Sequence, residues 1–270
     1  MNARATRVLS LVACVSLCAA GTAIAQVAGT GPVRTGYLGP AGLPDLTRVL
    51  PPPPEAGDSR DAADLAVFKE TRKLEGTARW SLAQSDNNIG TAPLLNAFSC
   101  AMDLKIVPDD APTLAKLLSQ ASFDAGVASN RAKDAFGRKR PYQRETGNVC
   151  LTPQQIQNLA RSADYPSGHA TAGWMAGRLL AELEPDRATE ILWRARVYGE
   201  SRVVCGVHHV TAVEAGRTSA EAVLAALHGS AAFRADLDAA RQELQRLRES
   251  SQAKPATCDA ERVALLPRPY

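Results

Sequence analysis

Apolar and alanine residues recur at helical intervals along most of this 270-residue chain, while the alternation typical of strands is scarce. The segment 61–82, for example, carries Leu65, Phe68, Leu74 and Trp80 with alanines between them. Apolar residues at such intervals predict helices that bury one face, and alanine is the strongest helix former. The fold class predicted from the sequence is therefore all-α.

Short breaks divide the chain into separate predicted helices. Seven are expected, at 61–82, 91–102, 111–132, 167–183, 186–198, 207–227 and 231–249, with a break at 162–166. The Pro- and Gly-rich segment 26–56, which includes Pro51–Pro54, predicts an extended N-terminal segment with some polyproline II character. One helical domain is expected over 57–250, followed by a C-terminal tail at 251–270.

The first 25 residues have the layout of a secretory signal peptide. Arg4 and Arg7 precede an apolar run too short to span a bilayer, and a small-residue cleavage pattern ends at Ala25. Leu17 stands before Cys18, which argues against lipid attachment. We expect a periplasmic protein that leaves the membrane after cleavage.

Removal of this segment would take two of the 31 basic residues and none of the 28 acidic ones, which changes the formal charge from +3 to +1. A nearly neutral protein offers no general basic field for nucleic acid or an anionic membrane. We expect neither as a partner. The alanine-rich helices could offer a face for a homo-oligomer.

Four cysteines remain after cleavage: Cys100, Cys150, Cys205 and Cys258. An even number in an exported protein favours disulfides, and the spacing does not match a metal site. Of the three pairings that four cysteines allow, we favour Cys100 with Cys150 and Cys205 with Cys258.

Three polar clusters carry the chemistry, and the first is KDAFGRKRP at 133–141. It places Lys133 seven residues before Arg140. Near a helix end, two such cations can point at one anion, and Arg140 can engage two oxygens at once. A basic helix C-terminus that complements the helix dipole is the simpler interpretation of this cluster alone.

The second cluster, DYPSGHATAGW at 164–174, opens a predicted helix. Pro166 disfavours helix before it, and the free N–H groups at Ser167 and Gly168 can then bind an oxyanion. His169 is placed to transfer a proton. An ordinary N-cap by Ser167 would produce the same pattern.

The third cluster, SRVVCGVHH at 201–209, adds a cation, Arg202, and two adjacent histidines, His208 and His209. We expect the histidines on the first turns of the helix 207–227. Because neighbouring helical residues point about 100° apart, at most one of the two faces a given pocket.

Together and in order, the clusters resemble the three-part signature of the type 2 phosphatidic acid phosphatase superfamily. The matching elements are Lys133 and Arg140-Pro141, then Pro166-Ser167-Gly168-His169, then Ser201-Arg202 and His208. Given its size and predicted leader, the chain resembles a bacterial class A nonspecific acid phosphatase from about Leu50 to His228. The resemblance implies a single helical bundle of the phosphatidic acid phosphatase and vanadium haloperoxidase type.

The resemblance also implies a reaction, the hydrolysis of phosphate monoesters at acidic pH through a phosphohistidine, without a metal or other cofactor. His208 would be the nucleophile, His169 the general acid, and His209 would have no role. The residues implied to hold the phosphate are Lys133, Arg140, Ser167, Gly168 and Arg202. If His208 starts neutral and His169 charged, the rate should follow a bell-shaped profile on the acid side of neutrality.

One position departs from the family pattern, which has an aspartate four residues after the nucleophile. Here that position is Ala212. On a helix, residues i and i+4 share a face, so the aspartate would orient the imidazole, and alanine cannot. Thr211 or a bridging water could substitute, Glu214 should point elsewhere, and restoring the aspartate should raise the rate.

This departure leaves two functions open. The chain is a working but slower phosphatase, or it is a phosphate-binding protein with weak or no turnover. A vanadate-dependent haloperoxidase shares much of the cation set but is normally a longer chain. The sequence does not mark the leaving-group pocket, so it leaves the physiological substrate open.

Overall fold

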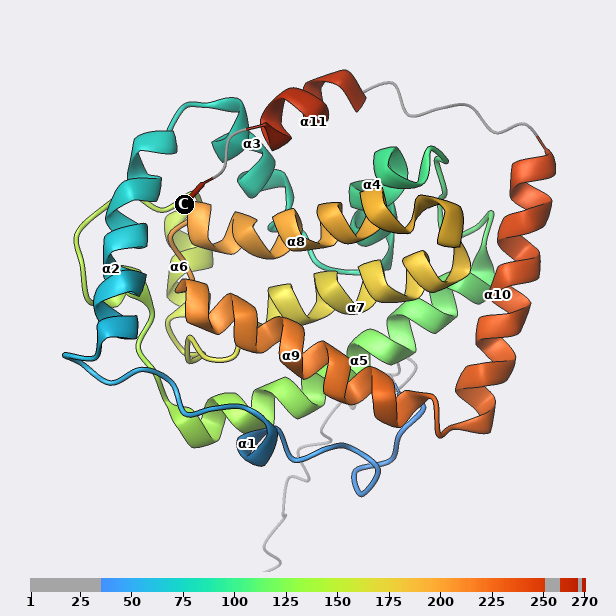
Figure 1. Ribbon diagram of the computed structural model, residues 1–270, viewed down its shortest axis with the longest axis horizontal. Coiled ribbons are helices and arrows are strands. Elements are labelled where there is room, and N and C mark those ends of the chain that lie inside the picture. The colour runs from blue at the N-terminus through green and yellow to red at the C-terminus, as the bar shows by residue number, and fades with distance from the viewer. Residues whose placement is uncertain (1–34, 251–257, 267–268) are drawn as a thin grey trace, which may run out of the picture. The chain divides into compact units, whose positions relative to one another are not determined.

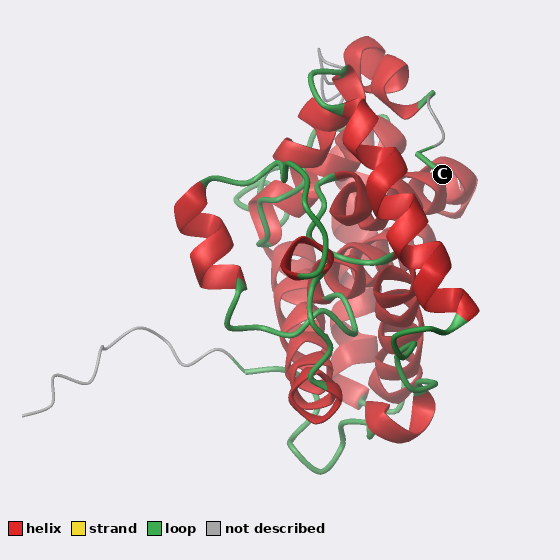
Figure 2. Ribbon diagram, turned by 90° about the vertical axis from the view of Figure 1, so that its left-hand side faces the viewer, coloured by secondary structure: helices red, strands yellow, loops and turns green. Residues whose placement is uncertain are grey.

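The computed structural model describes residues 35–250, 258–266 and 269–270 (Figure 1). The predicted signal peptide lies outside these residues. Every regular element in the described segments is a helix, which confirms the all-α fold class (Figure 2). None of the described helices is long and apolar enough to cross a membrane.

Four long helices form the centre of the bundle. They are α5 (Pro112–Phe136), α7 (Gly168–Leu183), α8 (Ala188–Val204) and α9 (Val210–Leu227). Helix α7 packs against the other three. A Cβ on Gly173 would lie 2.2 Å from Cδ1 of Tyr198, and one on Gly177 would lie 2.3 Å from Cβ of Ala195. Glycine at these two positions therefore allows the close approach of α7 and α8.

The remaining elements surround this centre. They are α1 (Leu46–Val49), α2 (Ser59–Thr71), α3 (Ala78–Ser85), α4 (Thr91–Met102), α6 (Pro153–Leu159), α10 (Ala231–Glu249), α11 (Cys258–Leu265) and the 3₁₀ turns η1 (Arg72–Leu74), η2 (Pro141–Gln143) and η3 (Pro185–Arg187). Helix α10 packs against α5, and α3 packs against both α8 and α11. The main core contains fully buried Leu114 of α5, Met175 and Leu179 of α7, and Phe233 of α10.

The packing brings four helix ends together at the polar clusters. The C-terminal ends of α5 and α8 carry Lys133 and Arg202, while α7 and α9 begin just after Ser167 and His209. Helix N-termini present free N–H groups and a partial positive charge. This end of the bundle is therefore suited to an anion.

Two predicted helices differ from the structure in ways that matter. The single helix expected at 61–82 is wrong, because α2 ends at Thr71, η1 ends at Leu74, and Gly76, with a φ of +77°, turns the chain before Thr77 caps α3. The helix expected from residue 207 begins only at Val210, with His209 as its N-cap. The two histidines therefore lie in the loop between α8 and α9, not on a helix.

The disulfide pairing favoured from the sequence is also wrong. The structure joins Cys100 to Cys258 and Cys150 to Cys205, with Cα–Cα distances of 5.4 and 4.7 Å. The backbone N–H of Cys150 donates to the Cys205 carbonyl at 3.1 Å, which holds the loop before α6 against the end of α8. Cys258 begins α11 beside α4, so the stretch expected as a tail carries a helix linked to the bundle.

Candidate active site

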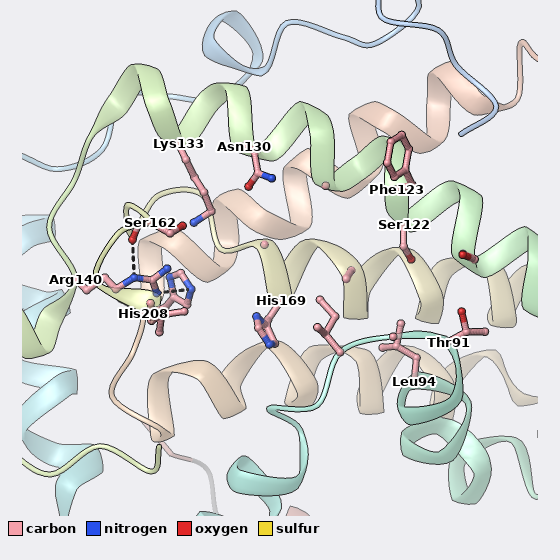
Figure 3. A pocket seen from close by; sticks show the side chains of 17 residues that line it. Thr91, Leu94, Ser122, Phe123, Asn130, Lys133, Arg140, Ser162, His169 and His208 are labelled. Atoms are coloured by element: carbon pink, nitrogen blue, oxygen red, sulfur yellow. Dashed lines mark hydrogen bonds between the residues drawn. The ribbon is translucent and has the colours of Figure 1, made fainter. Parts of the chain in front are cut away.

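A cavity of about 390 Å³ opens where α5, α7 and the loop before α9 meet (Figure 3). Five of the predicted site residues line it: Lys133, Arg140, Gly168, His169 and His208. Ser167 and Arg202 are fully buried and do not line it. The structure thus gathers the three clusters around one cavity, with two members behind its wall.

Lys133 projects into the cavity from the last turn of α5 (Figure 3). Its Nζ donates to the carbonyl of Ala163 at 2.7 Å. Burial, with a smaller contribution from the nearby Arg140 cation, lowers the pKa of Lys133 to about 7. At acidic pH the ammonium is charged and lacks a carboxylate partner among the described residues.

Arg140 lies just before η2 and is held by backbone carbonyls. Its Nε donates to Ser162 at 2.8 Å, its Nη2 to Ala163 at 3.2 Å and its Nη1 to Val207 at 2.8 Å. These bonds fix the plane of the guanidinium without neutralising its charge. A fixed planar guanidinium is suited to bind two oxygens of a phosphate.

Ser167 and Gly168 form the start of α7. The Ser167 hydroxyl accepts the N–H of Ala170 at 3.3 Å, so the simple N-cap interpretation of this residue is confirmed. The Ser167 N–H donates to the carbonyl of Ala212 at 2.8 Å, which ties this turn to the start of α9. Gly168 lines the cavity beside Lys133 and allows a ligand to approach the backbone closely.

Arg202 is a buried cation that forms no ion pair with the described residues. None of its three guanidinium nitrogens has a hydrogen-bond partner within the described part of the chain. Burial lowers the pKa of Arg202 to about 10, so the side chain stays charged at acidic pH. A buried, unpaired guanidinium is costly, and a phosphate oxyanion is the kind of ligand that would pair it.

His169 follows Gly168 in the first turn of α7. Its Nε2 lies 3.1 Å from the carbonyl oxygen of Asn87, so Nε2 carries the proton and Nδ1 is the nitrogen free to exchange one. Burial, and then the cations led by Arg202, lower the pKa of His169 to about 3. The expectation of a charged His169 is therefore wrong for the site without a bound anion. A phosphate dianion among the same cations would raise this pKa.

His208 is 3% exposed and bonded through both ring nitrogens. Its Nδ1 lies 2.9 Å from Oδ1 of Asp164, and its Nε2 lies 2.9 Å from Nη1 of Arg140 (Figure 3). A carboxylate accepts and a guanidinium donates, so Nδ1 carries the proton and Nε2 keeps its lone pair. Burial and the Arg140 charge hold the pKa of His208 well below its usual value, which leaves the ring neutral.

Asp164, in the loop before α7, is the residue that sequence reasoning missed. Its carboxylate is fully buried and also accepts Nδ1–H of His209, at 2.7 Å on Oδ2. Burial alone would raise the pKa of Asp164, but the bonds from His208 and His209 outweigh it and hold this pKa well below its ordinary value. The carboxylate is therefore ionised across the acid range.

Ala212, in the first turn of α9, does not leave His208 without a carboxylate. Neither a bridging water nor Thr211 needs to be invoked, because Asp164 already occupies Nδ1. The Thr211 hydroxyl donates to Asp64 and accepts from Arg138 at 2.8 Å, so it is engaged elsewhere. The inference of a missing partner failed because it considered only acceptors that follow His208 in the chain, whereas Asp164 approaches from the loop before α7.

The described residues offer little to bind a metal cation, at the site or beyond it. Within residues 35–250 and the two short C-terminal segments, no three or more His, Cys, Asp and Glu side chains are grouped so as to hold a metal ion. The charged side chains that line the cavity are the cations Lys133 and Arg140, and the described part of its lining includes no carboxylate. This donor set fits an anion.

The part of the chain that carries most of these residues matches a known family of proteins. The model of the PAP2 superfamily matches residues 114–235. The chain is 40% identical over 202 residues to an acid phosphatase of Zymomonas mobilis subsp. mobilis, which covers 75% of this chain and 76% of that protein. It is 35% identical over 214 residues to a non-specific acid phosphatase of Providencia stuartii, and this match covers 79% of this chain and 86% of that protein. It is 32% identical over 196 residues to a non-specific acid phosphatase of Salmonella typhimurium, and this match covers 72% of this chain and 78% of that protein. The chain therefore belongs to the PAP2 superfamily, among relatives of the bacterial non-specific acid phosphatases.

Proposed function

We propose that this protein hydrolyses phosphate monoesters at acidic pH through a phosphohistidine on His208. Its family makes it a phosphatase, and the relatives named acid phosphatase support monoesters as substrates. The observation that carries the proposal is the state of His208. Its neutral ring donates Nδ1–H to a carboxylate and turns the Nε2 lone pair toward the guanidinium that would bind phosphate.

In the first step, the Nε2 lone pair of His208 attacks phosphorus in line with the ester oxygen. The N–P bond forms as the P–O ester bond breaks, and the ester oxygen leaves with the electron pair. His169 gives that oxygen a proton, so the alcohol departs neutral. Arg140 must yield its hydrogen bond to Nε2 and take phosphate oxygens instead, which a flat guanidinium can do with little movement.

In the second step, a water molecule attacks the phosphohistidine. His169, now neutral, takes a proton from the water as the O–P bond forms. The N–P bond breaks and its electron pair returns to Nε2. The site is restored with one alcohol and one phosphate released.

Fixed cations would stabilise the charge that spreads over the phosphoryl oxygens. Lys133 and Arg140 line the site, the unpaired Arg202 lies behind its wall near His169 and Arg140, and Gly168 opens α7 toward the cavity. Phosphoryl transfer depends mainly on positioning and electrostatic stabilisation. Three cations and a helix N-terminus supply both, and we propose that the reaction needs no metal.

The rest of the cavity wall would receive the leaving group. It is mixed in character, with apolar Ile89, Leu94 and Phe123 beside Ser122 and Asn130. Such a wall accepts an apolar or aromatic group without a demanding set of polar contacts, which suits a phosphatase of broad specificity. With the predicted signal peptide, we propose action in the periplasm on small phosphate esters.

A binding protein without turnover is not favoured. That alternative depended on an unoriented His208, and Asp164 supplies the carboxylate that Ala212 cannot. The relatives named acid phosphatase also favour hydrolysis over a haloperoxidase reaction.

Hydrolysis of p-nitrophenyl phosphate at about pH 5 to 6, below the ordinary histidine pKa, tests the proposal. We expect His208→Ala to lower kcat by at least about 10³-fold, because the nucleophile is lost. The control is His228→Ala, a half-exposed histidine whose Nε2 lies near Glu182. If His208→Ala keeps a tenth of the parent rate or more, about 1.4 kcal/mol of barrier or less, His208 is not the nucleophile.

A further inference from the structure

We infer that Asp164 is the carboxylate that orients His208 in this chain, in place of one at position 212, and that His209 holds this carboxylate in position. The inference rests on the proposed role of His208 as nucleophile. Asp164 is a positioning residue in this account, because it contacts the reacting imidazole and not the phosphate.

Asp164 is fully buried and is held from several directions. Its backbone N–H donates to the Arg138 carbonyl at 2.8 Å, which fixes the loop. Oδ1 accepts from His208 Nδ1 at 2.9 Å and from the His209 backbone N–H at 3.3 Å. Oδ2 accepts from His209 Nδ1 at 2.7 Å and lies 3.5 Å from Nη1 of Arg138. Both oxygens are engaged, so the carboxylate cannot rotate away from His208.

This contact decides which nitrogen of His208 can attack. A buried carboxylate can only accept, so it fixes the proton on Nδ1 and leaves the lone pair on Nε2. The same contact stabilises positive charge that develops on the ring as Nε2 bonds to phosphorus. Without it, either tautomer could form and the ring could turn.

His209 has no place in the cavity lining but makes a strong contact with Asp164. Its Nδ1 donates to Oδ2, while its Nε2 has no hydrogen-bond partner among the described residues. Its backbone also begins α9. The side chains of the two adjacent histidines therefore donate to different oxygens of the same carboxylate, and His209 acts on Asp164 instead of on the substrate.

Positions 164 and 212 lie on segments that are directly bonded. The Ser167 N–H donates to the Ala212 carbonyl at 2.8 Å, and Ala212 is fully buried. A carboxylate on either segment could therefore approach His208. Two together would place two buried negative charges side by side, which is strongly unfavourable. With one acid at 164 and alanine at 212, Nδ1 of His208 has a carboxylate acceptor and that repulsion is avoided.

Asp164→Asn is the direct test, because it keeps the shape and removes the charge. We expect kcat for p-nitrophenyl phosphate to fall by about 10²- to 10⁴-fold, the upper value being that of the same change in a serine-protease triad. The inhibition constant of inorganic phosphate should change by less than about threefold, because Lys133, Arg140 and Arg202 are untouched. The surface variant Asp109→Asn, on the loop before α5, is the matched control.

Moving the carboxylate is the second test. In the parent, Ala212→Asp should give no gain in kcat and should lower the unfolding temperature, contrary to the expectation from sequence. In the Asp164→Asn background, the same substitution should restore kcat at least about tenfold. A purely structural role for Asp164 would not predict this rescue.

The results separate the inference from the proposed function. If Asp164→Asn keeps more than about a third of the parent kcat, a change of less than 1 kcal/mol, the inference is overturned. If His208→Ala is inactive while Asp164→Asn is not, only the inference fails. If His208→Ala retains the rate, the proposed function fails first. Should Asp164→Asn not fold, the proton NMR spectrum of the parent decides. A strongly downfield Nδ1–H signal that disappears in His208→Gln supports the contact, and its absence refutes it.

Discussion

Replacement of Arg202 by methionine should make the protein more stable and a poorer enzyme at the same time. The guanidinium is fully buried and lacks a hydrogen-bond partner in the described segments. Its pKa, lowered by burial from 12.5 to about 10, corresponds to roughly 3 kcal/mol of destabilisation carried by the charged form. At pH 5 to 6 the group is charged in both the folded and the unfolded chain, so the folded state bears the whole cost.

The gain in stability should appear only without phosphate. In phosphate-free buffer at about pH 6, the methionine variant should unfold several degrees higher, since 1 kcal/mol shifts Tm by about 2–4 °C in a domain of this size. Saturating phosphate should raise the Tm of the parent more than that of the variant, because Arg202 is the cation that gains a partner. Differential scanning calorimetry with and without phosphate measures both effects.

The loss of activity follows from the same unpaired donors. Each charge-assisted hydrogen bond from Arg202 to a phosphoryl oxygen should contribute roughly 1.5–3 kcal/mol, so the loss of two lowers kcat/KM by about 10²- to 10⁴-fold. Arg196→Met, on the same helix but half-exposed, is the control. The reasoning is refuted if Arg202→Met lowers Tm without phosphate and leaves kcat/KM within about threefold of the parent.

Four further outcomes follow from the structure. Binding of inorganic phosphate should weaken as pH rises through about 7, because Lys133 then loses its charge. In a plot of the phosphate inhibition constant against pH, Lys133→Arg should move this weakening to higher pH. On the acid side, kcat/KM should stay high well below pH 6, because His208 remains neutral there, and a steep loss near pH 6.5 would contradict this. Replacement of both Cys150 and Cys205 by serine should lower the free energy of unfolding, measured in urea, by about 4 kcal/mol. This value is the chain-entropy estimate for a loop of 55 residues, and an unchanged urea midpoint would contradict it. Gly173→Ala should cost about 1–3 kcal/mol by forcing Tyr198 aside, measured in the same way, whereas no loss would show that α7 and α8 can separate freely.

The parts of the fold that depend on local pattern could be predicted from sequence. The ranges 91–102 and 231–249 match α4 and α10 residue for residue, because apolar spacing and clear breaks define them. The break before Ser167 and the start of α7 were predicted from Pro166 and the Ser-Gly pair. Local chemistry was sufficient in these places.

The features that depend on tertiary contact could not be predicted in the same way. Gly76 turns the chain between η1 and α3, where apolar spacing alone would continue one helix, and the disulfides join residues 158 and 55 positions apart. The start of α9 was placed three residues too early, which put His208 on a helix and made Ala212 look decisive.

The role of Asp164 had one signal in the sequence, an acid directly before Tyr165 and Pro166 in a chain that lacks the acid at 212. That signal acquires meaning only when the loop before α7 is known to lie against the loop before α9. The structure brings the predicted cations Lys133 and Arg140 into the lining of one cavity, and the unpaired state of Arg202 behind it is visible only in the structure.

The phosphoenzyme itself can be trapped and located. Rapid acid-free quenching of the parent during hydrolysis of a labelled phosphate monoester, followed by peptide mass spectrometry, should find one phosphate on His208, labile in acid and stable in base. With p-nitrophenyl phosphate, whose leaving group needs no proton in the first step, His169→Ala should accumulate this species, because its second step lacks the base. Phosphate on any other residue, or turnover at the parent rate by His208→Ala without a labelled histidine, would contradict nucleophilic catalysis by His208.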